Sequence, residues 1–76
     1  MIKEHDRVVL TLNVADKALE KGDVGTVVHV YSGGDAFEVE FVSLDGRTEA
    51  IATLKAPEIR PLKQHEISHA RELAIA

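Results

Sequence analysis

The 76-residue sequence contains no cysteine. Disulfide bonds and thiolate metal sites are therefore excluded, and nothing in the composition indicates an oxidising compartment. Aromatic residues make up only 4%, which leaves valine, leucine, isoleucine and alanine to form most of the core. No stretch approaches the roughly 20 apolar residues of a membrane helix. The N-terminal run MIKEHDRVV also lacks the apolar segment of a signal peptide. We therefore expect a soluble cytoplasmic protein without a membrane partner.

Positive charge is scarce in this chain. Nine lysines and arginines stand against 13 aspartates and glutamates, so the formal net charge is −4. Nucleic-acid binding depends on neutralising phosphates, so the sequence disfavours a nucleic-acid partner unless a local basic patch exists. Hydrophobic residues make up 45%, which is typical of a folded domain rather than a disordered chain. A chain of this length forms one domain, which buries about 60% of the surface that its unfolded form exposes.

Short runs of strand-forming residues alternate with turn residues over most of the chain. Strands are predicted over residues 6–12, 24–31, 36–43 and 48–54, and residues 58–62 are predicted to form a short fifth strand or a single tight turn leading into one. The third run is the clearest, because FEVEF alternates apolar side chains with Glu38 and Glu40, which predicts one buried face and one carboxylate face. SGGD at 32–35 and DG at 45–46 are typical hairpin turns. Five short strands with tight turns predict a small closed barrel.

Three further features complete the expected fold. Gly25 lies inside the second predicted strand, where a glycine indicates a sharp bend or a close backbone approach. The connection before that strand is predicted to be a loop, from which Leu19 points inward. The final run QHEISHARELAIA has good helix formers and neither glycine nor proline, which predicts a helix. Residues 1–62 would form the barrel, and residues 63–76 a C-terminal helical extension of the same domain.

The motif set DRVVL…KGDVGTVVHVY…FEVEF…DG…IRPL, which spans about Lys3 to Leu62, resembles a family of small bacterial proteins of unknown function. These proteins are described as SH3-like barrels. The resemblance implies a mainly β fold, a five-stranded SH3-like barrel here followed by the C-terminal α-helix. It also implies a stand-alone protein of the kind found near toxin–antitoxin or immunity gene pairs. The shorter run KGDVGTVVHV is similar to the KOW segment of ribosomal and transcription-elongation proteins, which implies RNA or protein binding.

The run HEISH at residues 65–69 matches the zinc-protease pattern H-E-x-x-H. In that pattern two histidines one helical turn apart bind the metal, and the glutamate activates a water molecule. On the expected helix, however, His65 and His69 lie opposite the apolar residues and face solvent, and no third ligand follows. We therefore expect no catalytic metal and no cofactor. These two histidines would hold a transition metal only adventitiously.

The remaining candidates for a binding site are few. Lys21 and Asp23 lie in the loop before the second strand, which would form a binding lip. Tyr31 is the one plausible stacking ring outside the core. Arg60 is predicted to pair with a carboxylate of the third strand and to fix the end of the chain. His29 lies among valines and is predicted to be a packed, hydrogen-bonded residue rather than a ligand.

These features favour a non-enzymatic interaction module with a protein partner. One specific form is the accessory, antitoxin or immunity half of a two-gene system. Because apolar residues of the expected C-terminal helix cover more than one stripe, a homodimer through that helix is a further hypothesis. The alternative is a KOW-like nucleic-acid-binding protein, and the third option is a zinc hydrolase acting through HEISH.

Overall fold

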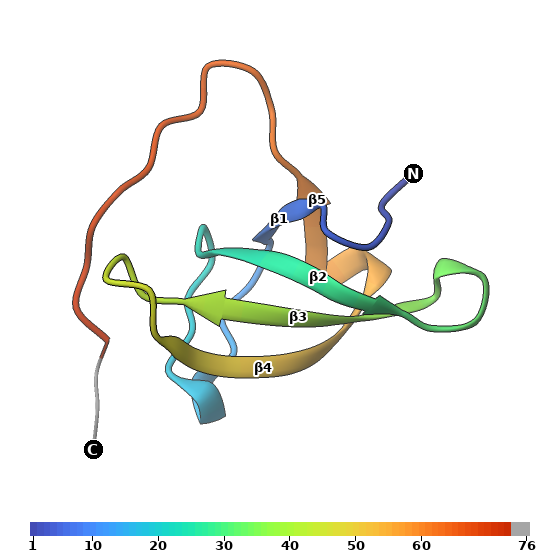
Figure 1. Ribbon diagram of the computed structural model, residues 1–76, viewed down its shortest axis with the longest axis horizontal. Helices are drawn as coiled ribbons and strands as arrows, with labels where there is room; N and C mark the ends of the chain where they lie inside the picture. Colours follow the sequence, from blue (N-terminus) through green and yellow to red (C-terminus); the bar gives the residue numbers. More distant parts are fainter. Residues whose placement is uncertain (74–76) are drawn as a thin grey trace.

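A computed structural model describes residues 1–73 as one antiparallel sheet (Figure 1). Its strands are β1 (Arg7–Leu10), β2 (Val24–Val30), β3 (Ala36–Val42), β4 (Thr48–Lys55) and β5 (Ile59–Pro61). Their order across the sheet is β4-β3-β2-β1-β5. Three single 3-10 turns, η1 (Ala15–Lys17), η2 (Ser32–Gly34) and η3 (Ala56–Glu58), lie between strands. The mainly β composition and the five predicted strands are therefore confirmed to within a few residues.

The two hairpins of the sheet form where the turn residues predict them. β2 and β3 are joined through η2, in which Gly33 and Gly34 both have positive φ, 67° and 84°. Glycine adopts this region without a steric penalty, which allows the chain to reverse there. β3 then pairs with β4 from Ala36↔Lys55 to Val42↔Thr48, with one irregularity near the β3–β4 turn. This long pairing makes β3 and β4 the main hairpin of the domain.

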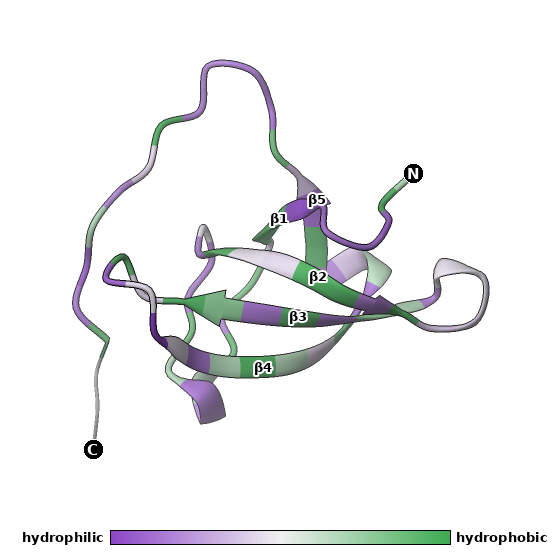
Figure 2. Ribbon diagram, viewed as in Figure 1, coloured by the Kyte–Doolittle hydropathy of each residue, from purple (hydrophilic) through white to green (hydrophobic). Residues whose placement is uncertain are grey.

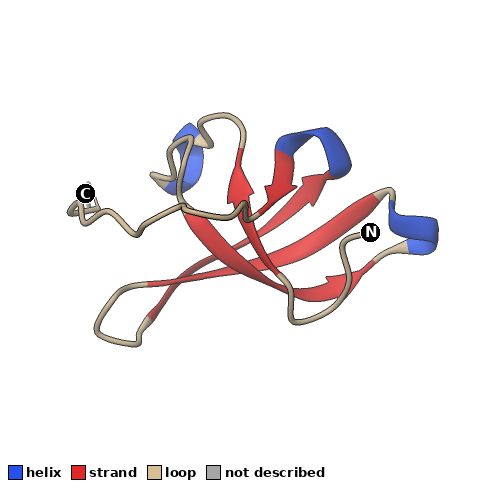
Figure 3. Cartoon of the chain, turned by 90° about the horizontal axis from the view of Figure 1, so that it is seen from above, coloured by secondary structure: helices blue, strands red, loops and turns tan. Residues whose placement is uncertain are grey.

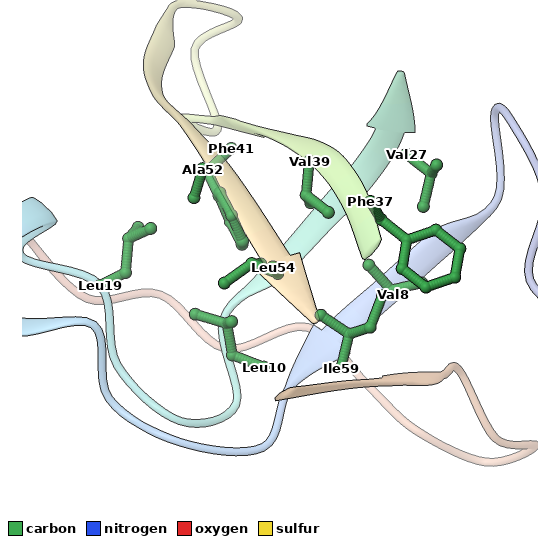
Figure 4. Close-up of a cluster of buried hydrophobic side chains, with 10 residues drawn as sticks. All are labelled: Val8, Leu10, Leu19, Val27, Phe37, Val39, Phe41, Ala52, Leu54 and Ile59. Carbon is green, nitrogen blue, oxygen red and sulfur yellow. The ribbon is translucent and has the colours of Figure 1, made fainter. Parts of the chain in front are cut away.

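The core lies on the inner face of the curved sheet. Ten buried side chains from all five strands and one loop form a single cluster (Figure 4): Val8, Leu10, Leu19, Val27, Phe37, Val39, Phe41, Ala52, Leu54 and Ile59. Leu19 is the member from the loop before β2, so the prediction that it points inward is confirmed. Burial of this apolar surface is the main stabilising term for a domain of this size.

The outer face of β3 carries the predicted glutamates, and the alternation is visible as colour bands along that strand (Figure 2). Each glutamate has a hydroxyl partner on the neighbouring strand. Thr53 Oγ1 donates to Glu38 Oε1 at 2.6 Å, and Thr48 Oγ1 donates to Glu40 Oε2. The apolar face is covered by the curled sheet itself and by the loop that carries Leu19, whereas the outer face is solvated.

The prediction that His29 is a packed residue is wrong. The register of β2 against β3 shifts between Val27 and His29, so Val28 is an extra residue at a bulge. His29 then lies opposite Glu38 on the outer face, where its side chain is 54% exposed. The bulge is the reason, because it changes which side chains of β2 face the core.

The predicted C-terminal helix is also wrong. Residues 62–73 run as an extended segment that leaves β5, arcs outward and returns to the loop before β2, which Arg71 contacts (Figures 1 and 3). His65 has φ 68°, a left-handed value that an α-helix cannot contain. A helix of this length is marginal in water without a surface to pack against, so good helix formers alone do not secure it. The end of the expected helix, residues 74–76, lies outside the described residues.

The predicted closed barrel is corrected as well. The sheet is open, with β4 and β5 at its two ends and no pairing between them in the part of the chain that the structure describes. β5 has only three residues and ends at Pro61, which has no backbone N–H to continue a ladder.

No helix within residues 1–73 has the length and apolar character that crossing a membrane requires.

Candidate functional site

A groove of about 900 Å³ lies between the sheet domain and the C-terminal segment. One wall is the loop before β2, residues 19–24, which contains the predicted site residues Lys21 and Asp23. A second wall is the end of β3 with the β3–β4 turn, residues 41–45, and the third is the segment 67–73. The groove mixes apolar with charged side chains.

Arg71 closes this groove by reaching the loop before β2. Its Nε donates to Asp23 Oδ1 at 3.0 Å, and its Nη2 donates to Asp23 Oδ2. The same Nη2 also donates to the carbonyl oxygen of Ala18 at 3.1 Å, and Nη1 lies 3.6 Å from Glu20 Oε2. The Arg71 guanidinium thus makes a bidentate contact with the Asp23 carboxylate, and two further acceptors lie around it.

Asp23 is held in place by the backbone of its own loop. Its Oδ2 accepts the N–H of Glu20 at 2.7 Å, while the backbone N–H of Asp23 donates to the Glu20 carbonyl. Burial on its own would raise the pKa of Asp23. The hydrogen bonds from Arg71 and from the Glu20 N–H, together with the charge of Arg71, outweigh burial and lower this pKa below its ordinary value. The carboxylate is therefore ionised and aligned at neutral pH.

Sequence reasoning selected Asp23 but missed its partner Arg71. In residues 64–76 Arg71 is the one lysine or arginine, which is a signal that could have drawn attention to it. The pairing itself spans 48 positions and depends on the path of an irregular segment, which no local pattern encodes. Lys21, the other residue selected in this loop, uses its backbone N–H to reach Asn13 Oδ1 at 2.8 Å and leaves its side chain exposed.

Arg60 pairs with Glu66 rather than with a carboxylate of β3, so that prediction is wrong. Its Nη1 and Nη2 donate to Glu66 Oε1 and Oε2 at 3.0 and 2.6 Å. The backbone N–H of Lys63 donates to the same carboxylate at 2.6 Å. Glu66 lies only six positions along the chain from Arg60, whereas the carboxylates of β3 accept hydrogen bonds from threonine hydroxyls.

Glu66 is expected to titrate with a pKa of about 2, because the Arg60 side chain and the Lys63 N–H both hydrogen-bond its ionised form. An NMR titration of the side-chain carboxyl resonances measures this directly. In the variant Arg60→Gln the midpoint should rise towards the ordinary glutamate value near 4.5. A midpoint near the ordinary value in the unsubstituted chain would contradict the pair in solution.

The HEISH histidines do not converge on a site. His65 and His69 are both exposed on the extended segment, so the helical face that would aim them together does not exist. The glutamate between them, which a zinc protease uses to activate water, is engaged by Arg60. No group of three histidine, aspartate or glutamate side chains in residues 1–73 is arranged to hold a metal ion. Residues 65–69 therefore do not form the helix face that a catalytic or an adventitious metal site on these histidines would require.

Tyr31 lies on the outer face and is not brought to the groove. Its hydroxyl donates to Glu38 Oε1 at 3.3 Å, and its ring meets the ring of His29 edge-on with centroids 4.6 Å apart. The negative charge of Glu38, followed by burial and this hydrogen bond, raises the pKa of Tyr31. The four binding residues selected from the sequence thus fall at three places: Lys21 and Asp23 in the groove, Arg60 at the start of the C-terminal segment, and Tyr31 on the sheet.

A second surface feature is the free edge of β4. β4 has eight residues and ends the sheet, so only its β3 side is paired. The run AIATL, residues 50–54, carries no charge, and Ile51 in it is 48% exposed. Within residues 50–54 the described chain makes no hydrogen bond to any segment other than β3. The edge thus presents unpaired backbone groups beside an apolar side chain.

A family model described as a domain of unknown function, DUF4926, matches residues 4–61. This chain belongs to that family. The DUF4926 match ends at the last residue of β5, so it includes the Ala18–Asp23 loop and all five strands but not Arg71. Comparisons with curated proteins and with solved structures gave no match. The predicted membership of a family of unknown function is confirmed. No match supports the SH3-like identity, and the KOW likeness stays a prediction.

Proposed function

We propose that this chain is a non-catalytic protein-interaction module that pairs with an extended segment of a protein partner along the free edge of β4. The single observation that carries the proposal is the uncharged, unpaired run of residues 50–54. Addition of a strand to an exposed sheet edge is a recurring mode of peptide recognition. Backbone hydrogen bonds supply affinity in this mode, and alternate side chains supply specificity.

The two ends of this sheet differ in how they treat their edges. Native proteins blunt exposed edges with short strands, proline or charged side chains, because an open edge invites pairing with other chains. β5 follows this rule, with three residues and a terminal Pro61. β4 is longer, and its charges, Glu49 and Lys55, lie outside the run 50–54. One edge of the sheet is therefore protected against pairing and the other is not. This difference supports a binding role for the β4 edge.

Side chains around the edge indicate the chemistry of the partner. Ile51 pairs across the sheet with Glu40, and Thr53 with Glu38, so all four lie on the outer face. An added strand would place its own side chains beside Ile51 and Thr53, with the two glutamates one strand further in. A partner segment with a β-branched or aromatic residue opposite Ile51, and without acidic residues facing this surface, fits best.

The bonding of three carboxylates in residues 1–73 supports the non-catalytic part of the proposal. The outer-face carboxylates of β3 are bonded to threonine hydroxyls and face solvent, and the carboxylate of HEISH is bonded to Arg60. An accessory, antitoxin or immunity role in a two-gene system is a specific form of the proposal, and its support is the family resemblance. That form requires the partner to be encoded by the neighbouring gene.

The decisive experiment compares three baits in pull-downs from the native host. The unsubstituted chain and Val28→Lys are expected to retain the same partner, whereas Ile51→Lys should lose it. Val28 is a matched control because it is 42% exposed, similar to Ile51, but lies at the bulge of β2 inside the sheet. Recovery of one partner set by all three baits would argue against the β4 edge.

Two further readouts separate strand addition from other kinds of binding. Amide hydrogen exchange in residues 50–54 should slow when the partner binds, because strand addition protects edge N–H groups. Binding that persists after nuclease treatment and changes little between about 0.1 and 0.5 M salt indicates a protein partner. A steep loss over that range would point to nucleic acid instead and contradict the proposal.

A further inference from the structure

We infer that the loop from Ala18 to Asp23 is a binding site for the guanidinium group of an arginine, and that the C-terminal segment occupies it as a built-in competitor. The external ligand would be an arginine side chain on an extended segment of a protein partner. This site lies in the groove rather than along β4, so the inference does not rest on the proposed use of the β4 edge.

The acceptors of the loop match a guanidinium on two of its sides. The Asp23 carboxylate receives Nε and Nη2, the Ala18 carbonyl receives Nη2, and the Glu20 carboxylate stands 3.6 Å from Nη1. The side chains of Arg71 and Asp23 are only 22% and 20% exposed when they meet. Partial exclusion of water strengthens such a contact relative to an ion pair on an open surface.

The acceptors are positioned by contacts that do not involve Arg71. The Gly22 N–H donates to the Leu10 carbonyl at 2.9 Å, and the Leu10 N–H donates to the Asp23 carbonyl at 2.9 Å. Val14 and Leu19 form an isolated β-bridge, which fixes the other end of the loop. All of these groups lie within residues 4–61, the part matched by the DUF4926 model. The loop therefore keeps its acceptors in place when the guanidinium leaves.

The occupant, in contrast, is held to the sheet domain by hydrogen bonds of a single residue. Arg71 lies beyond the family match, and within the described chain its guanidinium supplies every hydrogen bond from residues 67–73 to the sheet domain. Ile67 on the same segment is 91% exposed. A short tether gives the segment a local concentration of about millimolar or above, which keeps the site occupied until a tighter ligand arrives.

The rest of the groove indicates what a tighter ligand would add. Val42 and Leu44 line it and are among the exposed large apolar residues, so the segment of this chain leaves apolar wall uncovered. A partner segment with an arginine and an adjacent apolar side chain would engage both features. Burial of that wall would supply the affinity needed to displace Arg71.

Arginine rather than lysine is the expected ligand. Asp23 and Ala18 accept three N–H groups from Arg71, which a planar guanidinium presents in fixed directions. An ammonium group is a single charged point and cannot reach the two carboxylate oxygens and the carbonyl in the same geometry. Discrimination between the two side chains is therefore a direct test of this site.

The experiment uses the full chain with Arg71→Gln, which opens the site, and a capped synthetic peptide of residues 67–73, ISHAREL, as the probe. In ¹⁵N NMR titrations the peptide should bind the opened variant and shift the amides of residues 18–23. The unsubstituted chain should bind it at least about tenfold more weakly, because its own segment competes. A peptide with lysine in place of arginine should also bind the opened variant at least about tenfold more weakly.

Three outcomes would overturn the inference. These are equal affinity for the arginine and lysine peptides, equal affinity of the opened and unsubstituted chains, or no binding to an opened variant whose NMR spectrum shows an intact fold. The variant Glu20→Gln is a milder test, because the Glu20 backbone that holds Asp23 remains, and it should weaken binding only slightly. Ile51→Lys should leave peptide binding unchanged, so this result and the test of the β4 edge can fail separately.

Discussion

Replacing Leu54 by alanine is expected to lower the free energy of unfolding by about 3 kcal/mol. Leu54 is 3% exposed, belongs to the core cluster and lies across from Phe37 in the β3–β4 pairing. The substitution removes buried apolar surface and leaves a cavity, and both effects destabilise the folded state. A domain of this length has a total stability of roughly 4–11 kcal/mol, so the loss is a large fraction of the whole.

The matched control for this prediction is Ile51→Ala on the same strand. Ile51 is three positions earlier and 48% exposed, and it lies on the opposite face, so its loss should cost less than about 1 kcal/mol. Urea denaturation followed by circular dichroism measures both values. Similar losses for the two substitutions would mean that β4 does not present one buried and one solvated face. A small effect of Ile51→Ala also shows that this position can be altered in binding experiments without unfolding the domain.

Replacing Gly25 by alanine is expected to destabilise the fold by about 2 kcal/mol through overpacking. A Cβ atom at this position would lie 2.6 Å from Val39 Cγ1, 2.9 Å from Phe41 Cε2 and 3.0 Å from the Glu40 carbonyl oxygen. These distances are well inside van der Waals contact, and the backbone oxygen cannot rotate away. The prediction that Gly25 marks a close backbone approach is thus confirmed. Its cause is the packing of β2 against β3 and not a left-handed backbone.

A double-mutant cycle with Val39→Ala tests this cause. Val39→Ala alone creates a cavity, but it also removes the atom that the new methyl group would strike first. The double variant should therefore be less destabilised than the sum of the two single variants, by about 1 kcal/mol. Thermal unfolding provides a second measure, since each 1 kcal/mol corresponds to about 4–8 °C in a domain of this size. Strict additivity would exclude a clash with Val39 as the cause.

Predictions made from sequence succeeded where a structure is encoded by near neighbours. The alternation in FEVEF produces the buried Phe37 and the partly exposed Glu38, because successive side chains of a strand point to opposite faces. The glycines after Ser32 likewise reverse the chain by their own backbone freedom. The same alternation gave a wrong prediction for His29, because one bulge shifts the register of β2 against β3.

The C-terminal segment shows the opposite case. Helix propensity in QHEISHARELAIA is a weak preference, and tertiary contacts of Arg71 and Glu66 decide the path of residues 62–73 instead. Neither contact was predicted. Arg71 reaches a loop 48 positions earlier, and Arg60 takes the carboxylate that HEISH would have used for catalysis. HEISH therefore does not adopt the helix that a zinc-protease motif requires.

The sequence by itself determined the number of strands, the two hairpin turns and the buried face of β3, because each follows from spacing within a few residues. Only the tertiary structure decided that the sheet stays open, that β4 keeps a free edge and that a groove is closed by Arg71 on Asp23. Those features depend on contacts between distant segments. Their free energies are small individually and are set by geometry that only the folded chain provides.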